Sequence, residues 1–125
     1  MEITVTDFFD AAHRLDYMPE LHSVSCTTMH GHTYKVEVVI EGNFHPLVAD
    51  FGIIKTNIRR FDHREISTVF EDLGFEGVTT AENITKCLWE ILEKQLPENV
   101  KVKQISLWEG WKGTNSNRVT MTEKP

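Results

Sequence analysis

Hydrophobic and polar residues alternate along two stretches near the start of the chain. Between Ile3 and His13 the odd positions are mostly apolar and most even positions are polar. From Tyr34 to Ile40 the even positions are apolar, and the turn residues Gly42-Asn43 follow shortly afterwards. Because neighbouring side chains of a strand point to opposite faces, both stretches are predicted to be half-buried β-strands. Residues 14–29 lack this pattern and are predicted to form a long loop, of a length that usually has a functional reason.

Helical spacing replaces alternation in the middle of the chain. Apolar residues recur every three or four positions over 51–61, which predicts a helix capped by Asp50 and ending near Asp62-His63. A second helix is predicted to run from Thr79 to Leu96, ahead of a proline. Thr79 and Glu82 have the form of a capping box, and an apolar stripe follows them.

Two further strands are predicted near the end of the chain, over Val100–Glu109 and Asn117–Thr122, joined by a turn through Gly110 and Gly113. The element order is then ββααββ within a single domain spanning residues 1–125. This order indicates an α+β fold, with a four-stranded antiparallel sheet and two helices on one face. Such a sheet leaves two open edges, so we expect the protein to be an oligomer that closes its sheets into a barrel.

Composition and charge narrow the choice of partners. Thirteen Lys and Arg residues against nineteen Asp and Glu residues give a formal net charge of −6, which disfavours nucleic acid. The first twenty residues carry five acidic side chains and no apolar run, so we expect neither a signal peptide nor a membrane span. Two cysteines are too few for a disulfide scaffold. These features together favour a cytosolic protein that acts on small molecules.

Three histidines are predicted to lie close together. His30 and His32 start the second strand on its apolar face, and His13 ends the apolar face of the first strand. Antiparallel pairing across the loop would bring all three imidazoles to one place. Three nitrogen ligands with an open fourth position are typical of catalytic zinc. The alternatives are separate histidines held by hydrogen bonds, or a structural zinc site with His22 as its fourth ligand.

Two other side chains require their own explanation. Cys26 lies in the long loop, with three residues between it and the His-Gly-His segment, whereas Cys87 lies on an apolar helical stripe and is expected in the core. Glu109 shares a strand face with apolar residues. A carboxylate there needs a partner that offsets its desolvation, either a ligand or a basic side chain.

Several ordered segments together resemble the family of 6-pyruvoyltetrahydropterin and 6-carboxytetrahydropterin synthases, which has the tunnelling fold. The matching segments are Ala11-Ala12-His13-Arg14-Leu15, Cys26 ahead of His30-Gly31-His32-Thr33-Tyr34, Asp50-Phe51, Phe61-Asp62-His63, Thr80-Ala81-Glu82-Asn83 and Glu109. The resemblance implies that His13, His30 and His32 bind Zn²⁺. It also implies a homo-oligomer, by analogy a hexamer, with active sites at subunit interfaces.

The resemblance further implies roles for the remaining site residues. Cys26 would be the general base, and Asp62 with His63 a relay that passes protons to and from it. Glu109 would bind the pterin ring through paired hydrogen bonds. Thr80, Ala81 and Glu82 would line the pterin pocket, although Glu82 could equally be only a capping residue. Basic side chains that could hold a triphosphate are Arg14, Lys55 and Arg118.

The spacing of the cysteine favours one branch of the family. Three residues separate Cys26 from His30, as in the carboxytetrahydropterin synthases, whereas the pyruvoyl branch has five. The implied reaction converts 7,8-dihydroneopterin triphosphate to 6-carboxy-5,6,7,8-tetrahydropterin, acetaldehyde and triphosphate, toward queuosine and related deazapurines. The alternatives are a pyruvoyltetrahydropterin synthase or a non-catalytic zinc- or pterin-binding module. Thr79 departs from the family, which usually has proline there.

Overall fold

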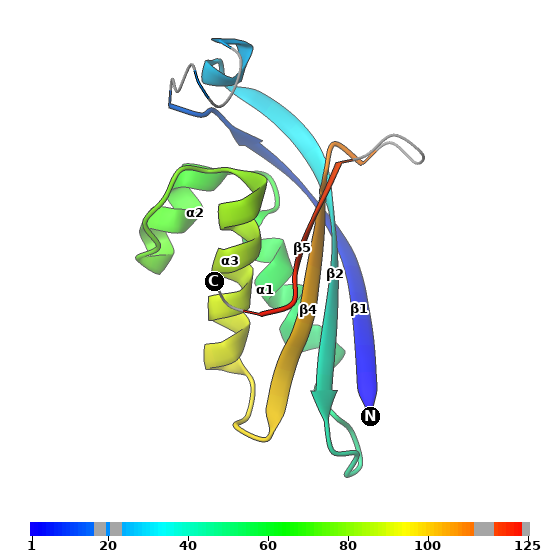
Figure 1. Cartoon of the computed structure of the whole chain (residues 1–125). Coiled ribbons are helices and arrows are strands. Elements are labelled where there is room, and N and C mark those ends of the chain that lie inside the picture. Colours follow the sequence, from blue (N-terminus) through cyan, green and yellow to red (C-terminus); the bar gives the residue numbers. More distant parts are fainter. Residues whose placement is uncertain (17–19, 21–23, 112–116, 124–125) are drawn as a thin grey trace.

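The computed structural model describes residues 1–16, 20, 24–111 and 117–123, and the four predicted strands all form (Figure 1). Strand β1 (Glu2–His13) pairs antiparallel with β2 (His30–Gly42) along its whole length. Strand β4 (Val100–Glu109) pairs with the other side of β2, and β5 (Asn117–Met121) with β4, both antiparallel. The predicted strand boundaries are therefore confirmed to within one or two residues.

The sheet has a fifth, very short strand that the sequence pattern did not predict. Strand β3 (Arg64–Glu65) lies parallel to β1, beside Ala11 and Ala12, and gives the order β3-β1-β2-β4-β5. The expected four-stranded, wholly antiparallel sheet is thus a mixed, five-stranded one. Two residues are too few to produce any alternation, because the period of a strand is itself two residues.

The helical layer holds three α-helices where the sequence predicted two. Helix α1 (Phe51–Ile58) begins after the predicted cap Asp50, and a 3₁₀ turn, η2 (Arg59–Phe61), continues it. Helix α2 (Ile66–Leu73) was not predicted; it ends at Gly74, whose φ of 67° a glycine adopts without strain. Eight residues carry too few helical repeats to stand out in the sequence.

Helix α3 (Ala81–Gln95) confirms the second predicted helix but corrects its cap. The cap is Thr80, whose hydroxyl accepts a hydrogen bond from the Asn83 amide at 3.1 Å. Thr79 does not cap the helix, because its hydroxyl instead donates to the backbone carbonyl of Arg14 at 3.1 Å. The capping box expected of Thr79 and Glu82 is therefore wrong by one position.

All three helices cover one face of the sheet and bury a single core (Figure 1). Helix α3 packs on β4 and β5, while α1 packs on β1 and α3. The strand side chains predicted to face inward do so, including Phe9, Tyr34 and Leu107, and Cys87 is buried among them as expected. Within the described residues, no helix is long and apolar enough to cross a membrane.

The long loop between β1 and β2 contains a 3₁₀ turn, η1 (Val24–Thr27), which carries Cys26. A backbone hydrogen bond from Leu15 to the carbonyl of Cys26, at 2.8 Å, ties this turn to the segment that follows β1. The cysteine is thereby held next to the ends of the two longest strands. His22, the alternative fourth ligand, lies outside the described residues.

Candidate metal centre and surrounding pocket

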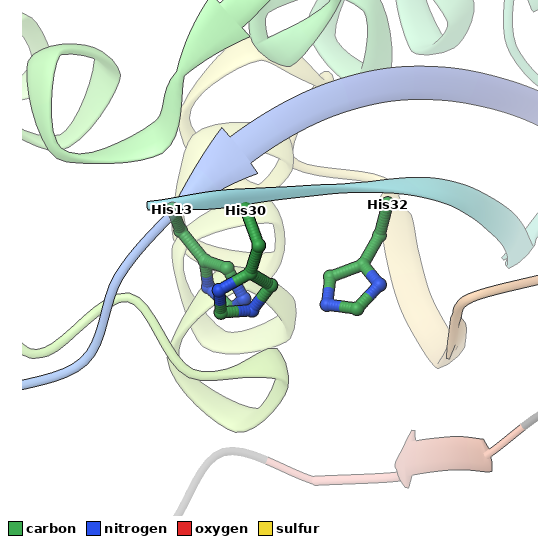
Figure 2. Close-up of side chains that lie close together, drawn as sticks. All are labelled: His13, His30 and His32. Carbon is green, nitrogen blue, oxygen red and sulfur yellow. The ribbon is translucent and has the colours of Figure 1, made fainter. Parts of the chain in front are cut away.

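The pairing of β1 with β2 brings the three histidines together. His13 pairs directly with His30, and His32 pairs with Ala11, two residues further along the two strands. Figure 2 shows the three side chains projecting from the same side of these strands. One ring nitrogen from each residue lies within 4.8 Å of those from the other two, so together they could hold a metal ion.

Hydrogen bonds to the backbone fix which nitrogen two of these rings present. Nδ1 of His13 lies 2.6 Å from the carbonyl oxygen of Thr79, and Nδ1 of His30 lies 2.6 Å from that of Thr28. A carbonyl oxygen can only accept, so Nδ1 must carry the proton in both rings. The Nε2 lone pairs are then available, which is the usual way protein carbonyls orient metal-binding imidazoles. The donor set therefore fits a divalent metal such as zinc.

A pocket of about 440 Å³ lies beside the three histidines. Its lining residues are His13, Leu15, Cys26, His30, Thr80, Ala81, Glu82, Glu109, Asn117, Arg118 and Val119. The Cys26 sulfur is not part of the tight group of three ring nitrogens, so the thiol lies on the pocket wall rather than in the ligand set. A pocket of this volume suits a small organic ligand.

Glu109 ends β4 at the rim of this pocket. One of its carboxylate oxygens lies 3.6 Å from Nε2 of His32, and the two side chains are 29% and 26% exposed. No Lys or Arg ion pair is recorded for Glu109 among the described residues, which leaves the carboxylate turned toward the pocket. The expectation that Glu109 faces a ligand rather than a basic side chain is compatible with this position.

Asp62 and His63 lie elsewhere, at the outer edge of β1. The Asp62 carboxylate lies 3.0 Å from Nδ1 of His63 and also accepts a hydrogen bond from the Asp10 amide, at 3.0 Å. The His63 amide donates to the Asp10 carbonyl at 2.7 Å, and His63 adopts a left-handed φ of 57°. The amide of Asp10, followed by His63, lowers the pKa of Asp62. The pair is therefore well formed but does not line the pocket that holds Cys26.

The hollow that His63 does line is a different one, of about 910 Å³, with Asp10 and Trp111 among its walls; His30 and His32 of the candidate metal centre border it as well. The Asp10 side chain accepts a hydrogen bond from Thr33, which lies on the face of β2 opposite to His32. The chain thus carries two histidine-containing sites, one beside α3 and one at the β1 edge.

The chain as a whole matches a known family. The 6-pyruvoyl tetrahydropterin synthase family matches residues 2–123. The chain belongs to this family. Its resemblance to the family, first seen in short motifs, therefore extends over nearly the whole sequence.

Two curated relatives and one solved structure are similar to the chain over most of their length. Dihydroneopterin monophosphate aldolase of Pyrococcus furiosus is 35% identical, over 82% of this chain and 83% of its own. The 6-carboxy-5,6,7,8-tetrahydropterin synthase of Haemophilus influenzae is 30% identical, over 81% of this chain and 86% of its own. The 6-pyruvoyl tetrahydropterin synthase of Caenorhabditis elegans has the same fold, with a TM-score of 0.70, 23% identity and coverage of 99% and 96%.

Within this family member, one pocket collects most of the site residues predicted from the sequence. His13, His30, Cys26, the Thr80–Glu82 segment and Glu109 all line it, and His32 completes the imidazole group. The predicted relay of Asp62 and His63 is separated from them. Among the three basic candidates for the triphosphate, Arg118 lines the pocket, whereas Arg14 lines a neighbouring depression.

Two residues of the site were not assigned a role by sequence reasoning. Thr79 was predicted to cap the helix and was noted as a departure from the family's proline, but it was given no part in the site; its carbonyl orients His13 and its hydroxyl anchors the end of β1. Tyr34 was assigned only to the apolar strand face, and its ring lies edge-on to both His13 and His32. The alternation of side chains along β2 puts Tyr34 on the same face as the histidines. It gives no reason, however, why this position should hold tyrosine rather than phenylalanine.

Proposed function

We propose that this protein is a zinc-dependent lyase acting on a pterin triphosphate. The proposed reaction converts 7,8-dihydroneopterin triphosphate and water to 6-carboxy-5,6,7,8-tetrahydropterin, acetaldehyde and triphosphate. The observation that supports it most is the pocket of about 440 Å³, which is lined by the Cys26 thiol, the Glu109 carboxylate and two of the three grouped imidazoles, those of His13 and His30. The three-residue spacing between Cys26 and His30 favours this branch of the family.

The three imidazoles are the residues that would hold the zinc. His13 and His30 would bind it through Nε2, because their Nδ1 atoms are hydrogen-bonded to backbone carbonyls. A divalent zinc bound there would supply Lewis-acid stabilisation of negative charge on the oxygens of the substrate side chain.

The protein groups around the pocket have distinct proposed tasks. Cys26, as a thiolate, would remove a proton from the substrate side chain. Glu109 would accept two parallel hydrogen bonds from the amino group and a ring nitrogen of the pterin, which orients the ring. The Thr80–Glu82 segment would line the ring, and Arg118 would contact the triphosphate.

The relay pair requires a second subunit in this proposal. Asp62 and His63 lie at the β1 edge and not in the pocket with Cys26, so one chain does not bring the three groups together. We therefore infer a homo-oligomer, a hexamer by resemblance, in which His63 of one subunit reaches the Cys26 pocket of another. A cytoplasmic location and a place in queuosine or deazapurine synthesis follow from the same assignment.

Product analysis tests the proposed reaction. Zinc-loaded protein is incubated with 7,8-dihydroneopterin triphosphate, and the products are identified by mass. Acetaldehyde together with a carboxypterin is the expected outcome. A pyruvoyl product would move the assignment to the other branch, and no turnover by protein that has bound zinc and pterin would support a binding module instead.

A second candidate comes from the similarity to the Pyrococcus furiosus protein named dihydroneopterin monophosphate aldolase, which is 35% identical. An aldolase would break the bond between the two hydroxyl-bearing carbons of the substrate side chain. The products would be a hydroxymethyl pterin and a phosphorylated two-carbon aldehyde, without loss of the phosphate. Parallel incubation with 7,8-dihydroneopterin monophosphate separates the two activities, since only the aldolase releases a phosphorylated aldehyde.

A further inference from the structure

Tyr34 buries a hydroxyl group that makes no well-formed hydrogen bond within the described part of the chain. The residue is fully buried, its ring stacks on Phe9 with centroids 4.8 Å apart, and the rings of His13 and His32 meet it edge-on. Its hydroxyl oxygen is the buried side-chain polar atom without a hydrogen-bond partner among the described residues. A phenylalanine would fill nearly the same volume without this unsatisfied group, so packing alone does not explain the hydroxyl.

The nearest chemistry to that hydroxyl is the carboxylate of Glu109. Tyr34 and Glu109 are direct partners across β2 and β4, and both side chains lie on the helix-covered face. A phenol keeps its proton at neutral pH and can donate a hydrogen bond to a neighbouring carboxylate. The Tyr34 hydroxyl lies close enough to the Glu109 carboxylate to interact with it, although the pair does not have the geometry of a well-formed hydrogen bond in this structure.

The other neighbour of Glu109 does not hold the carboxylate either. Nε2 of His32 lies 3.6 Å from it, beyond the range of a good hydrogen bond. If His32 used Nε2 to bind a metal, that nitrogen would have no proton left to donate. Of these two neighbours of Glu109, the Tyr34 phenol would then be the one that can still donate a hydrogen bond. A carboxylate has enough lone pairs to accept hydrogen bonds from both a phenol and a planar ligand.

We propose that Tyr34 is a positioning residue, whose hydroxyl donates a hydrogen bond to Glu109 and fixes the carboxylate for a ligand with two adjacent N–H donors. In this arrangement the buried hydroxyl is satisfied when the pocket is loaded. The ligand class follows from the proposed function, on which this inference rests. A purely structural tyrosine would have no such dependence on the ligand.

The test is Tyr34→Phe in the full-length protein, measured in two ways. The melting temperature of the variant without ligand should equal or exceed that of the wild type, because only an unsatisfied hydroxyl is lost. The Kd for 7,8-dihydroneopterin, measured by titration of zinc-loaded protein, should rise about tenfold, as expected for losing one hydrogen bond to a charged group. Zinc affinity should not change.

A double-mutant cycle connects the effect to Glu109. In a Glu109→Gln background, Tyr34→Phe should weaken binding of the same ligand by less than about twofold, because the charged acceptor is already gone. Ser106→Ala is the matched control: Ser106 is buried on the opposite face of β4 and pairs with Thr120, so its loss should lower the melting temperature and leave the Kd unchanged.

Two results would overturn the inference separately from the proposed function. Tyr34→Phe with an unchanged Kd in protein that binds 7,8-dihydroneopterin would refute the role of Tyr34 alone. Additive effects of the two substitutions would refute the contact with Glu109. Wild-type protein that binds zinc but not 7,8-dihydroneopterin would overturn the proposed function, and the inference with it.

Discussion

The two histidine sites of this chain are built by similar contacts but differ in how deeply the histidine side chain is buried. At the metal centre, His13 is 3% exposed and its ring is held by the Thr79 carbonyl. At the β1 edge, the His63 side chain is 80% exposed, although Asp62 holds its ring and Asp10 holds its backbone. Both histidines are oriented, and only the first is enclosed.

Under the proposed function, the difference in burial corresponds to two different tasks, metal binding and proton transfer. Binding a metal requires desolvated, fixed nitrogens, and two paired strands provide them within a single chain. Proton transfer requires a group that reaches the substrate, and an oriented imidazole at an exposed edge can do so only across an interface. The left-handed backbone of His63 supports this reading, since strained positions are often retained at functional sites.

The largest effect is expected at the enclosed site. Cys26→Ala should lower turnover of 7,8-dihydroneopterin triphosphate by about 10²- to 10⁴-fold, the usual contribution of a general base. Zinc content and pterin binding should remain, since the thiol lies outside the group of three imidazoles. Steady-state kinetics together with metal analysis checks both parts.

Cys87→Ala is the matched control for this prediction. Burial, and secondly the charge of Glu90, raises the pKa of the Cys87 thiol to about 12, so it stays protonated in the core. Its removal should cost about 1 kcal/mol of stability and leave turnover unchanged. Full activity of Cys26→Ala would show that another group is the base.

The next largest effect tests whether the two sites meet between subunits. Cys26→Ala and His63→Ala should each be nearly inactive alone. If the two variants are unfolded, mixed in equal amounts and refolded, about one quarter of wild-type activity should return, because sites that draw each group from a different subunit regain both intact residues. Size-exclusion chromatography of the mixture verifies that oligomers have formed.

The pairing of the variants also provides the contradicting outcome. If activity does not return although mixed oligomers form, Cys26 and His63 act within one chain. If His63→Ala alone keeps full activity, His63 has no role. A double variant carrying both substitutions, refolded with wild-type protein, serves as the control for simple dilution.

The sequence predicted the convergence of the three histidines well because strand parity is a strict rule. His13, His30 and His32 each continue the apolar face of a strand, and antiparallel pairing leaves them no other place than beside one another. The same rule placed Glu109 on the helix-covered face. Strands β1 and β2 were predictable for this reason, without any knowledge of the family.

The remainder depends on contacts that leave no local pattern. Strand β3 and helix α2 are too short for a periodic signal. The cap of α3 is Thr80 and not Thr79, because the Thr79 hydroxyl donates to the carbonyl of Arg14, 65 residues away in the sequence. The motifs also did not predict that the Asp62–His63 pair lies outside the pocket that Cys26 lines. A short motif identifies its residues but carries no information about which pocket of the folded chain they line.

The smallest effect is expected from the long-range contact of Thr79, the residue that replaces the family's usual proline. Thr79→Val keeps the carbonyl that orients His13 but removes the hydroxyl that anchors Arg14. Because the lost bond is one step removed from the ligand, zinc affinity should fall about threefold, less than the tenfold or more typical of direct partners of a ligand. Competition with a chromogenic chelator measures this change in zinc affinity.

Thr28→Val is the control: it keeps the carbonyl that orients His30, and its side chain is exposed. Equal zinc affinity of both variants and the wild type would mean that the Thr79 hydroxyl holds only the chain and not the metal ligand.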